Sequence, residues 1–226
     1  MGEESKEGRC YACGGDFPQS VLKRCSRCLL VRYCSRECQK VAWVNGHNKS
    51  CKPRAQLTKA LGRWMDIWRV VLCHFAGVSL DLSNHPADYN ATHMMVIWIT
   101  KRLDIQNPPS PQMFRVTKGD VWPLILCDAM WPELEFTPAK DMGINFLRLV
   151  VVLEDWAGDT LRVRTSSWRT ASLPMTRRLD KEDSKYFAEN WLQSVQDIIE
   201  KGDVSVKAVY DKLHREAAMF SRMLGD

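Results

Sequence analysis

The residues of this chain whose spacing most clearly indicates chemistry are cysteines, and they are concentrated near its N-terminus. Seven of the nine cysteines precede residue 52, and one of the five histidines lies among them. Thiolate sulfur and imidazole nitrogen are preferred ligands of Zn2+, and eight of them suit two tetrahedral ions with no open position. We therefore predict two structural Zn2+ ions. The eight ligands form four close pairs: Cys10 and Cys13, Cys25 and Cys28, Cys34 and Cys38, His47 and Cys51.

The spacing within each pair predicts the local structure that presents it. The C-x2-C pairs suit tight turns, whereas the C-x3-C and H-x3-C pairs have the i,i+4 spacing of one helical turn. Ser35 is a good N-cap for a helix over residues 36–45, and Gly46 is a good end for it. The residues that precede this helix, 21–34, are typical of a hairpin with Cys25 and Cys28 near its turn.

The four pairs can share two ions in two ways. A sequential arrangement groups the first four ligands and the last four. An interleaved arrangement groups alternate pairs, and it would crosslink a segment that is too small to build a hydrophobic core. Spacing leaves both arrangements open. In either case the segment should fold only with metal, because structural sites contribute about 10–16 kcal/mol.

The order of the four pairs, with aromatic and polar residues at set places between them, resembles a MYND-type zinc finger over residues 10–51. Tyr33, Ser35, Gln39 and Trp43 stand where that pattern has them. The resemblance implies the interleaved arrangement. One ion would then be held by Cys10, Cys13, Cys34 and Cys38, and the other by Cys25, Cys28, His47 and Cys51.

The same resemblance implies a peptide site. MYND fingers that bind peptides of the form P-x-L-x-P use a serine inside the second C-x2-C pair, a helix glutamine and a helix tryptophan. Here these residues are Ser26, Gln39 and Trp43. An indole face packs against proline rings, and amide and hydroxyl groups can bond to an extended peptide backbone. The competing interpretation places Trp43 in the core of the finger.

Charge is distributed as unevenly as cysteine. The chain has a net charge of +5, with a surplus of cations before residue 64 and a small deficit after it. We therefore expect a flexible N-terminus over residues 1–9, a finger at 10–51 and a second unit at 55–226.

A basic zinc module could contact the phosphates of nucleic acid. Because its cations are scattered, nucleic-acid contact is the alternative to peptide binding rather than the leading function.

Nothing in the sequence indicates a membrane protein or a secreted one. The first residues are charged and have no apolar segment of a secretory signal. The longest apolar runs are too short to span a bilayer. In a reducing compartment, clustered cysteines act as metal ligands rather than as disulfides. We therefore expect an intracellular protein of the nucleus or the cytoplasm.

Hydrophobic periodicity predicts an α+β fold for residues 55–226, with a mostly antiparallel sheet and about three helices. Arg148, Arg162 and Arg164 alternate with apolar residues, which predicts a basic, solvent-facing side of one hairpin. Its arginines could add to a nucleic-acid contact. We expect helices at 55–75, 181–200 and from 205 onward, strands at 93–100 and 121–127, and a hairpin of 144–153 with 160–165.

Residues 55–226 offer little sign of catalysis. MYND fingers can accompany SET methyltransferase domains, but after the Asn84-His85 pair this chain lacks the cysteine that such domains have, and it has no glycine-rich loop before the pair. We also find no G-x-S-x-G motif and no P-loop. Cys73 and Cys127 lie in apolar surroundings and are expected to be inert.

Residues 59–99 resemble the region that follows the finger in MYND-finger proteins of mushroom-forming fungi, which have no established activity. The leading prediction is thus a non-enzymatic protein that binds partner proteins through its finger, in a regulatory complex. The alternatives are a nucleic-acid-contacting regulator and an unrecognised enzyme in residues 55–226.

Overall fold

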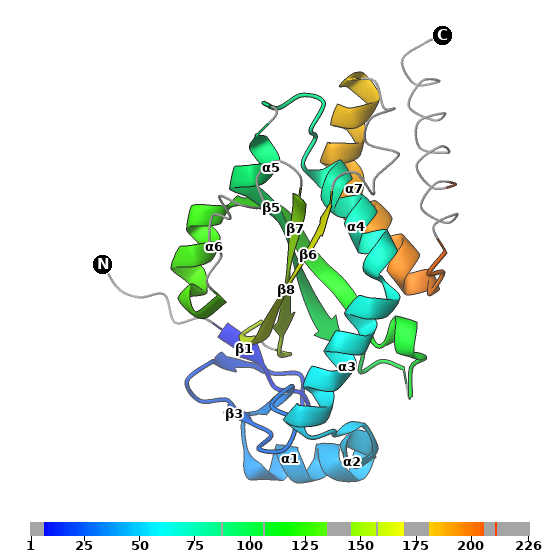
Figure 1. The fold of residues 1–226 in the computed structure, drawn as a ribbon. Coiled ribbons are helices and arrows are strands. Elements are labelled where there is room, and N and C mark those ends of the chain that lie inside the picture. The colour runs from blue at the N-terminus through cyan, green and yellow to red at the C-terminus, as the bar shows by residue number, and fades with distance from the viewer. Residues whose placement is uncertain are drawn as a thin grey trace, which may run out of the picture.

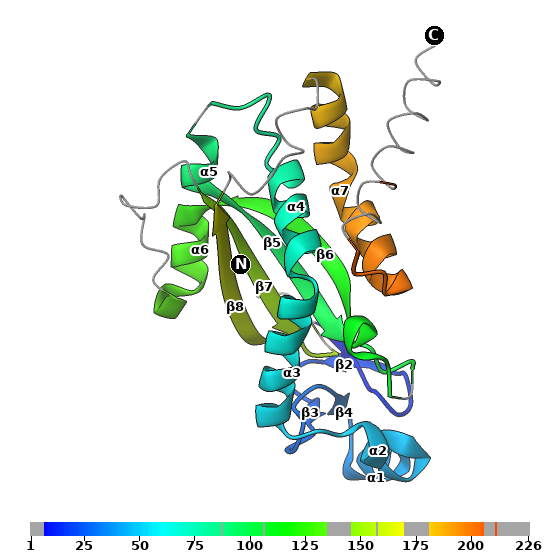
Figure 2. The ribbon, with the colours of Figure 1, turned by 45° about the vertical axis from the view of Figure 1, so that its right-hand side comes forward.

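The computed structural model describes residues 7–86, 88–105, 107–134, 146–156, 158–169, 181–205 and 211. It places the cysteine-rich segment against one end of a four-stranded sheet, with helices on both faces of that sheet (Figure 1). The helical segment of residues 54–79 connects the two parts. It begins beside the cysteine-rich segment and runs up along the sheet, as both views show (Figure 2).

Two small hairpins and a helix build the cysteine-rich segment. The hairpins are β1 with β2 and β3 with β4, and both are antiparallel. The Ser35 hydroxyl accepts a hydrogen bond of 3.1 Å from the Cys38 N–H, so the predicted N-cap is confirmed. The elements are β1 Glu7–Arg9, β2 Asp16–Pro18, β3 Lys23–Arg24, β4 Arg32–Tyr33, α1 Arg36–Ala42, the π-helical turn η1 Trp43–His47, and α2 Asn48–Ser50.

Two local predictions for this segment need correction. Residues 7–9, assigned from the sequence to a flexible N-terminus, form strand β1 because they pair with β2 across the turn that carries Cys10 and Cys13. Gly46 does interrupt the helix, with a φ of 117° that favours glycine. The chain does not leave the helical path there, however, but continues through η1 into α2, and this brings His47 back toward the hairpin.

The helix predicted at 55–75 is two helices, α3 Arg54–Ile67 and α4 Arg69–Ser79. Trp68 separates them, with φ −86° and ψ 4°. The indole N–H groups of Trp64 and Trp68 both donate to the carbonyl of Pro111, at 3.0 and 2.8 Å. One distant carbonyl therefore holds both rings at the junction of the helices, which periodicity could not predict.

The sheet has the strand order β6-β5-β7-β8. The outer pairs are antiparallel, and the central strands β5 and β7 are parallel, with Met95 opposite Leu149. The predicted α+β class, the mostly antiparallel sheet, the strand near 93–100 and the later hairpin are thus confirmed. The strands are β5 His93–Lys101, β6 Phe114–Pro123, β7 Phe146–Glu154 and β8 Thr160–Arg169.

The strand predicted at 121–127 is wrong in its second half. Strand β6 ends at Pro123, and α6 Leu124–Met130 begins at once. Proline cannot donate to a strand ladder, but its fixed φ suits the start of a helix. The remaining short elements are α5 Tyr89–Thr92 and the 3-10 turns η2 Ser110–Gln112 and η3 Pro132–Leu134.

Helices cover both faces of the sheet (Figures 1 and 2). On one face Leu149 and Val151 join the cluster of α4 and α7, and on the other Val150 and Val152 pack with Leu124 of α6. Central strands buried on both sides read as continuous apolar runs rather than as an alternation. The solvent-facing side predicted for β7 is therefore absent: Arg148 is buried and donates to the Ala91 carbonyl at 3.0 Å.

The closing helix predicted at 181–200 is confirmed as α7 Lys181–Lys201. Its predicted apolar face, with Phe187, Trp191, Val195 and Ile198, is buried. The helix predicted from residue 205 onward falls on residues 206–210 and 212–226, which lie outside the described part of the chain.

Packing of α7 on β6 makes Gly119 a sensitive position. A methyl group there would lie 2.3 Å from Cη2 of Trp191, which is buried. We expect Gly119→Ala to lower the free energy of unfolding by about 1–3 kcal/mol, as overpacking does. The control is Gly62→Ala in α3, where a methyl group meets nothing within 4 Å. Urea denaturation of both variants tests this, and equal stabilities would contradict it.

Candidate functional site

The first candidate metal centre joins the turn after β1 to the start of α1. Its four ligand atoms lie within 4.8 Å of one another. The Sγ atom of Cys34 lies 3.9 Å from that of Cys13 and 3.5 Å from that of Cys38. The complete set is Cys10, Cys13, Cys34 and Cys38.

The second candidate centre joins the turn between β3 and β4 to the end of the finger. All four of its residues are buried. Nε2 of His47 lies 3.4 Å from Sγ of Cys25 and 3.8 Å from Sγ of Cys28, and the sulfurs of Cys25 and Cys51 are 3.8 Å apart. The set is Cys25, Cys28, His47 and Cys51, so the interleaved arrangement is the one the fold adopts.

These distances fit zinc. In a tetrahedral site with Zn–S bonds of about 2.3 Å, neighbouring sulfurs lie about 3.8 Å apart, and a ligating imidazole nitrogen lies about 3.6 Å from a sulfur. A disulfide would need about 2.05 Å between sulfurs, and the nine cysteines are free. The two centres, one of four cysteines and one of three cysteines and a histidine, are closed sites for two structural zinc ions.

The surroundings prepare individual ligands for a metal. Burial opposes ionisation of the Cys10 thiol, but backbone N–H donors, including that of Cys34 at 3.5 Å, lower its pKa to about 6. Burial, reinforced by the charge of Lys101, lowers the pKa of His47 and so favours the neutral imidazole that binds zinc. By contrast, burial raises the pKa of Cys73 and of Cys127 to about 11. These two thiols stay protonated, as their apolar surroundings predict.

Of the residues that the sequence assigns to a peptide site, Trp43 and Ser26 adjoin ligands of the second centre, whereas Gln39 directly follows Cys38, a ligand of the first. The indole of Trp43 packs edge-on against the ring of His47, with centroids 5.9 Å apart. The backbone N–H of Trp43 donates to the Gln39 carbonyl, so the two residues are one helical turn apart. Ser26 is exposed and directly follows Cys25, another ligand of that centre. The second centre thus connects Ser26, through Cys25, to the His47 ring that Trp43 contacts.

Trp43 is not a core residue of the finger. Its side chain is 39% exposed, whereas Trp64 and Trp68 are almost completely buried. The nearby residues Val41 and Val44 are exposed as well. Helix α1 and the following turn thus present apolar side chains to solvent.

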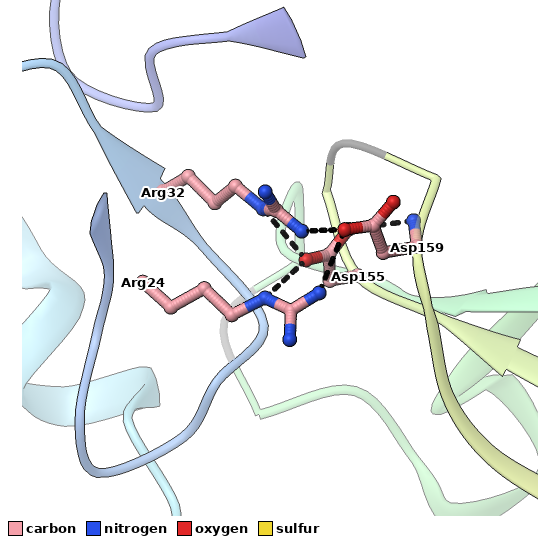
Figure 3. A network of polar contacts seen from close by, with 4 residues as sticks. All are labelled: Arg24, Arg32, Asp155 and Asp159. Atoms are coloured by element: carbon pink, nitrogen blue, oxygen red, sulfur yellow. Dashed lines mark hydrogen bonds and ion pairs between the residues drawn. The ribbon is translucent and has the colours of Figure 1, made fainter. Parts of the chain in front are cut away.

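A network of four charged residues holds the finger against the sheet (Figure 3). Arg32 and Arg24, from β4 and β3, form ion pairs with both Asp155 and Asp159, from the turn between β7 and β8. The Asp155 carboxylate has no solvent exposure. The backbone adds a hydrogen bond of 2.7 Å from the N–H of Trp156 to the Leu30 carbonyl.

Sequence reasoning did not identify this network. In the sequence, Asp155 and Asp159 fall between the two predicted hairpin strands 144–153 and 160–165, and Arg24 and Arg32 are two of the finger's scattered cations. The only signal was charge of opposite sign on two tight hairpins. Because 123 residues separate Arg32 from Asp155, nothing local could connect them.

Within the described part of the chain, no helix combines the length and the apolar character needed to cross a bilayer.

Residues 10–51 match a family model described as "MYND finger". Over 48 residues the chain is 44% identical to ubiquitin carboxyl-terminal hydrolase 19 of Arabidopsis thaliana. This match covers 21% of this chain and 6% of the relative. Over 55 residues it is 42% identical to histone-lysine N-methyltransferase ASHR1 of the same plant, which covers 24% of this chain and 11% of that protein. No solved structure matches the chain significantly.

These relatives match the finger and leave the rest of the chain uncovered. The chain spans about a tenth or less of their length. MYND fingers are zinc-binding modules that commonly mediate protein–protein interaction. The matched segment and the two interleaved metal centres coincide, so residues 10–51 of this chain are a MYND finger.

Proposed function

We propose that the finger binds a proline- and leucine-containing peptide of a partner protein, as part of a regulatory complex. The exposed indole of Trp43 supports this proposal, because it packs against the zinc ligand His47 and lies one helical turn from Gln39. Proline rings pack on indole faces, and a proline-containing peptide that is already extended loses little conformational entropy on binding. We expect a dissociation constant on the order of 1 μM, with Trp43 as the anchor.

Trp43→Ala is expected to weaken peptide binding at least about tenfold while both zinc ions remain, because anchor tryptophans carry much of the binding energy. The probe is a fluorescein-labelled, uncharged peptide containing Pro-Ala-Leu-Ala-Pro, measured by fluorescence anisotropy with the full zinc-loaded chain. Zinc content is determined in parallel.

The matched control is Trp156→Ala, which removes another exposed indole, 48% accessible, that contacts the finger through Tyr11. This control should keep its affinity for the peptide. If Trp43→Ala loses zinc together with binding, Trp43 supports the fold and the proposed groove is wrong. Equal weakening by both variants would also contradict the proposal.

The nucleic-acid alternative has weaker support. Arg24 and Arg32, two of the finger's cations, are paired with aspartates and unavailable for phosphate. Arg148, expected on a basic sheet face, is buried. The proposal also assigns binding rather than catalysis to this chain, since relatives with enzyme names resemble it only over the finger.

A further inference from the structure

A groove runs along α3 where this helix leaves the finger. It consists of two adjoining cavities of about 300 and about 280 Å3 that share Gln56, Ala60 and Met113. Their combined size is in the range of pockets that hold ligands. The α3 groove, defined by these two cavities, lies apart from Ser26, Gln39 and Trp43, because none of them lines either cavity.

The floor of the α3 groove is apolar. Leu57 and Ala60 of α3 form it together with Met113, and Ile105 and Pro108 extend it at the finger end. Leu57 is only 4% exposed, so its side chain is anchored in the core below. Burial of an apolar side chain of a ligand on this floor would contribute roughly 25 cal/mol per Å2.

The rim of the α3 groove is basic. Lys49, Lys52 and Lys101 line the finger end, Lys59 and Arg63 line the other, and neither cavity has an acidic lining residue. Among the described residues, none of these five cations forms an ion pair with a carboxylate, although the Lys101 ammonium donates to the Ser50 carbonyl at 3.0 Å. Arg102 also lines the groove but forms an ion pair with Asp104, which it shares with Arg115, so it is not counted among these five cations.

The spacing of the cations fits an extended chain. Lys59 and Arg63 are i,i+4 on α3, which corresponds to a rise of about 6 Å. Alternate residues of an extended peptide are about 6.6–6.8 Å apart and point to the same side. Acidic side chains at alternate positions could therefore reach successive cations while apolar side chains between them face the floor.

We propose that the α3 groove binds an extended acidic segment of a partner protein, in which carboxylates alternate with apolar side chains. Positive charge without internal acids attracts such a segment, and the apolar floor selects for it over a simple anion. A single-stranded nucleic acid fits less well, because it needs exposed aromatic rings for stacking. The aromatic residue of the groove, Trp64, is 1% exposed and donates to Pro111.

A fluorescein-labelled peptide of alternating Glu and Leu tests the proposal by fluorescence anisotropy on the full zinc-loaded chain. The double variant Lys59→Glu with Arg63→Glu is expected to weaken binding at least about tenfold, because it puts repulsion where two attractive contacts stood. Both residues are exposed on α3 and neither is a metal ligand. Retained zinc and an unchanged urea midpoint show that the variant is folded.

The matched control is Arg162→Glu with Lys185→Glu, which changes the net charge equally at exposed positions of β8 and α7 outside the groove. It should stay within about twofold of the parent chain, since distant charges act weakly through salt. Trp43→Ala should also bind the acidic peptide normally, which separates this groove from the finger's peptide site.

Three results would overturn the proposal. One is equal weakening by the control pair, which would indicate a general charge effect. Another is equally tight binding of a peptide of alternating Gln and Leu, which would leave carboxylates no role. The third is displacement of the acidic peptide by a single-stranded oligonucleotide at lower concentration than by unlabelled peptide, which would identify a nucleic-acid site instead.

Discussion

Replacing Cys25 by serine is expected to reduce zinc from two ions to one per chain. The lost ion is the one that Cys25 shares with His47, because the four ligands of that centre lie together around one point. Structural zinc sites contribute about 10–16 kcal/mol, so loss of one thiolate from a closed site removes most of that affinity. The centre of Cys10 and Cys34 should remain at least partly filled.

Metal analysis and Co2+ substitution measure this result. The remaining centre has four cysteine ligands and the lost one has three cysteines and a histidine, so their Co2+ spectra differ. His47→Ala should empty the same centre as Cys25→Ser. Cys127→Ser, which alters a buried thiol outside the finger, should keep both ions. If His47→Ala instead emptied the centre of Cys10, the interleaved arrangement would be wrong.

Asp155→Ala should lower the free energy of unfolding by about 3–5 kcal/mol, the cost of breaking a buried ion pair. The Asp155 carboxylate has no solvent exposure, and its partner Arg32 is 7% exposed (Figure 3). The neighbouring carboxylates raise the pKa of Arg32 although burial opposes this, so Arg32 stays charged. Removing Asp155 therefore leaves a buried cation with Asp159 as the remaining carboxylate of its pair.

Urea denaturation measures this effect, and Asp66→Asn, at an exposed position of α3, is the control that should change stability by less than about 0.5 kcal/mol. A double-mutant cycle with Arg32→Gln isolates the pair. We expect a coupling energy of about 1–3 kcal/mol, because the two residues share one network. Additive effects would show that Asp155 acts through its own turn and not by docking the finger.

The local features of this protein follow from its sequence. The metal ligands come in pairs three or four positions apart, and Ser35 caps its helix through a bond from the N–H of Cys38, three positions later. The periodicity of α7 placed Trp191 and Val195 on the buried face, where they lie. Each of these signals acts within one or two turns of chain, so it needs no knowledge of the rest of the molecule.

Contacts between distant segments determined the features that local sequence patterns did not predict. The spacing of the ligands allows two arrangements of zinc, and the choice requires the β3–β4 turn to meet the end of the finger. Similarly, the carbonyl of Pro111 holds the rings where α3 gives way to α4, more than forty residues away along the chain. Arg148 is buried because helices cover both faces of the sheet, although its alternating neighbours predict exposure.

The docking of the finger on the sheet also depends on contacts between segments that are distant in sequence. Arg32 and Asp155 are each ordinary hairpin residues in sequence, and each becomes important only when the other lies beside it. Periodicity and capping report which face of an element is apolar, but not which element covers it. That choice depends on burial and charge pairing summed over the whole molecule, which local patterns do not contain.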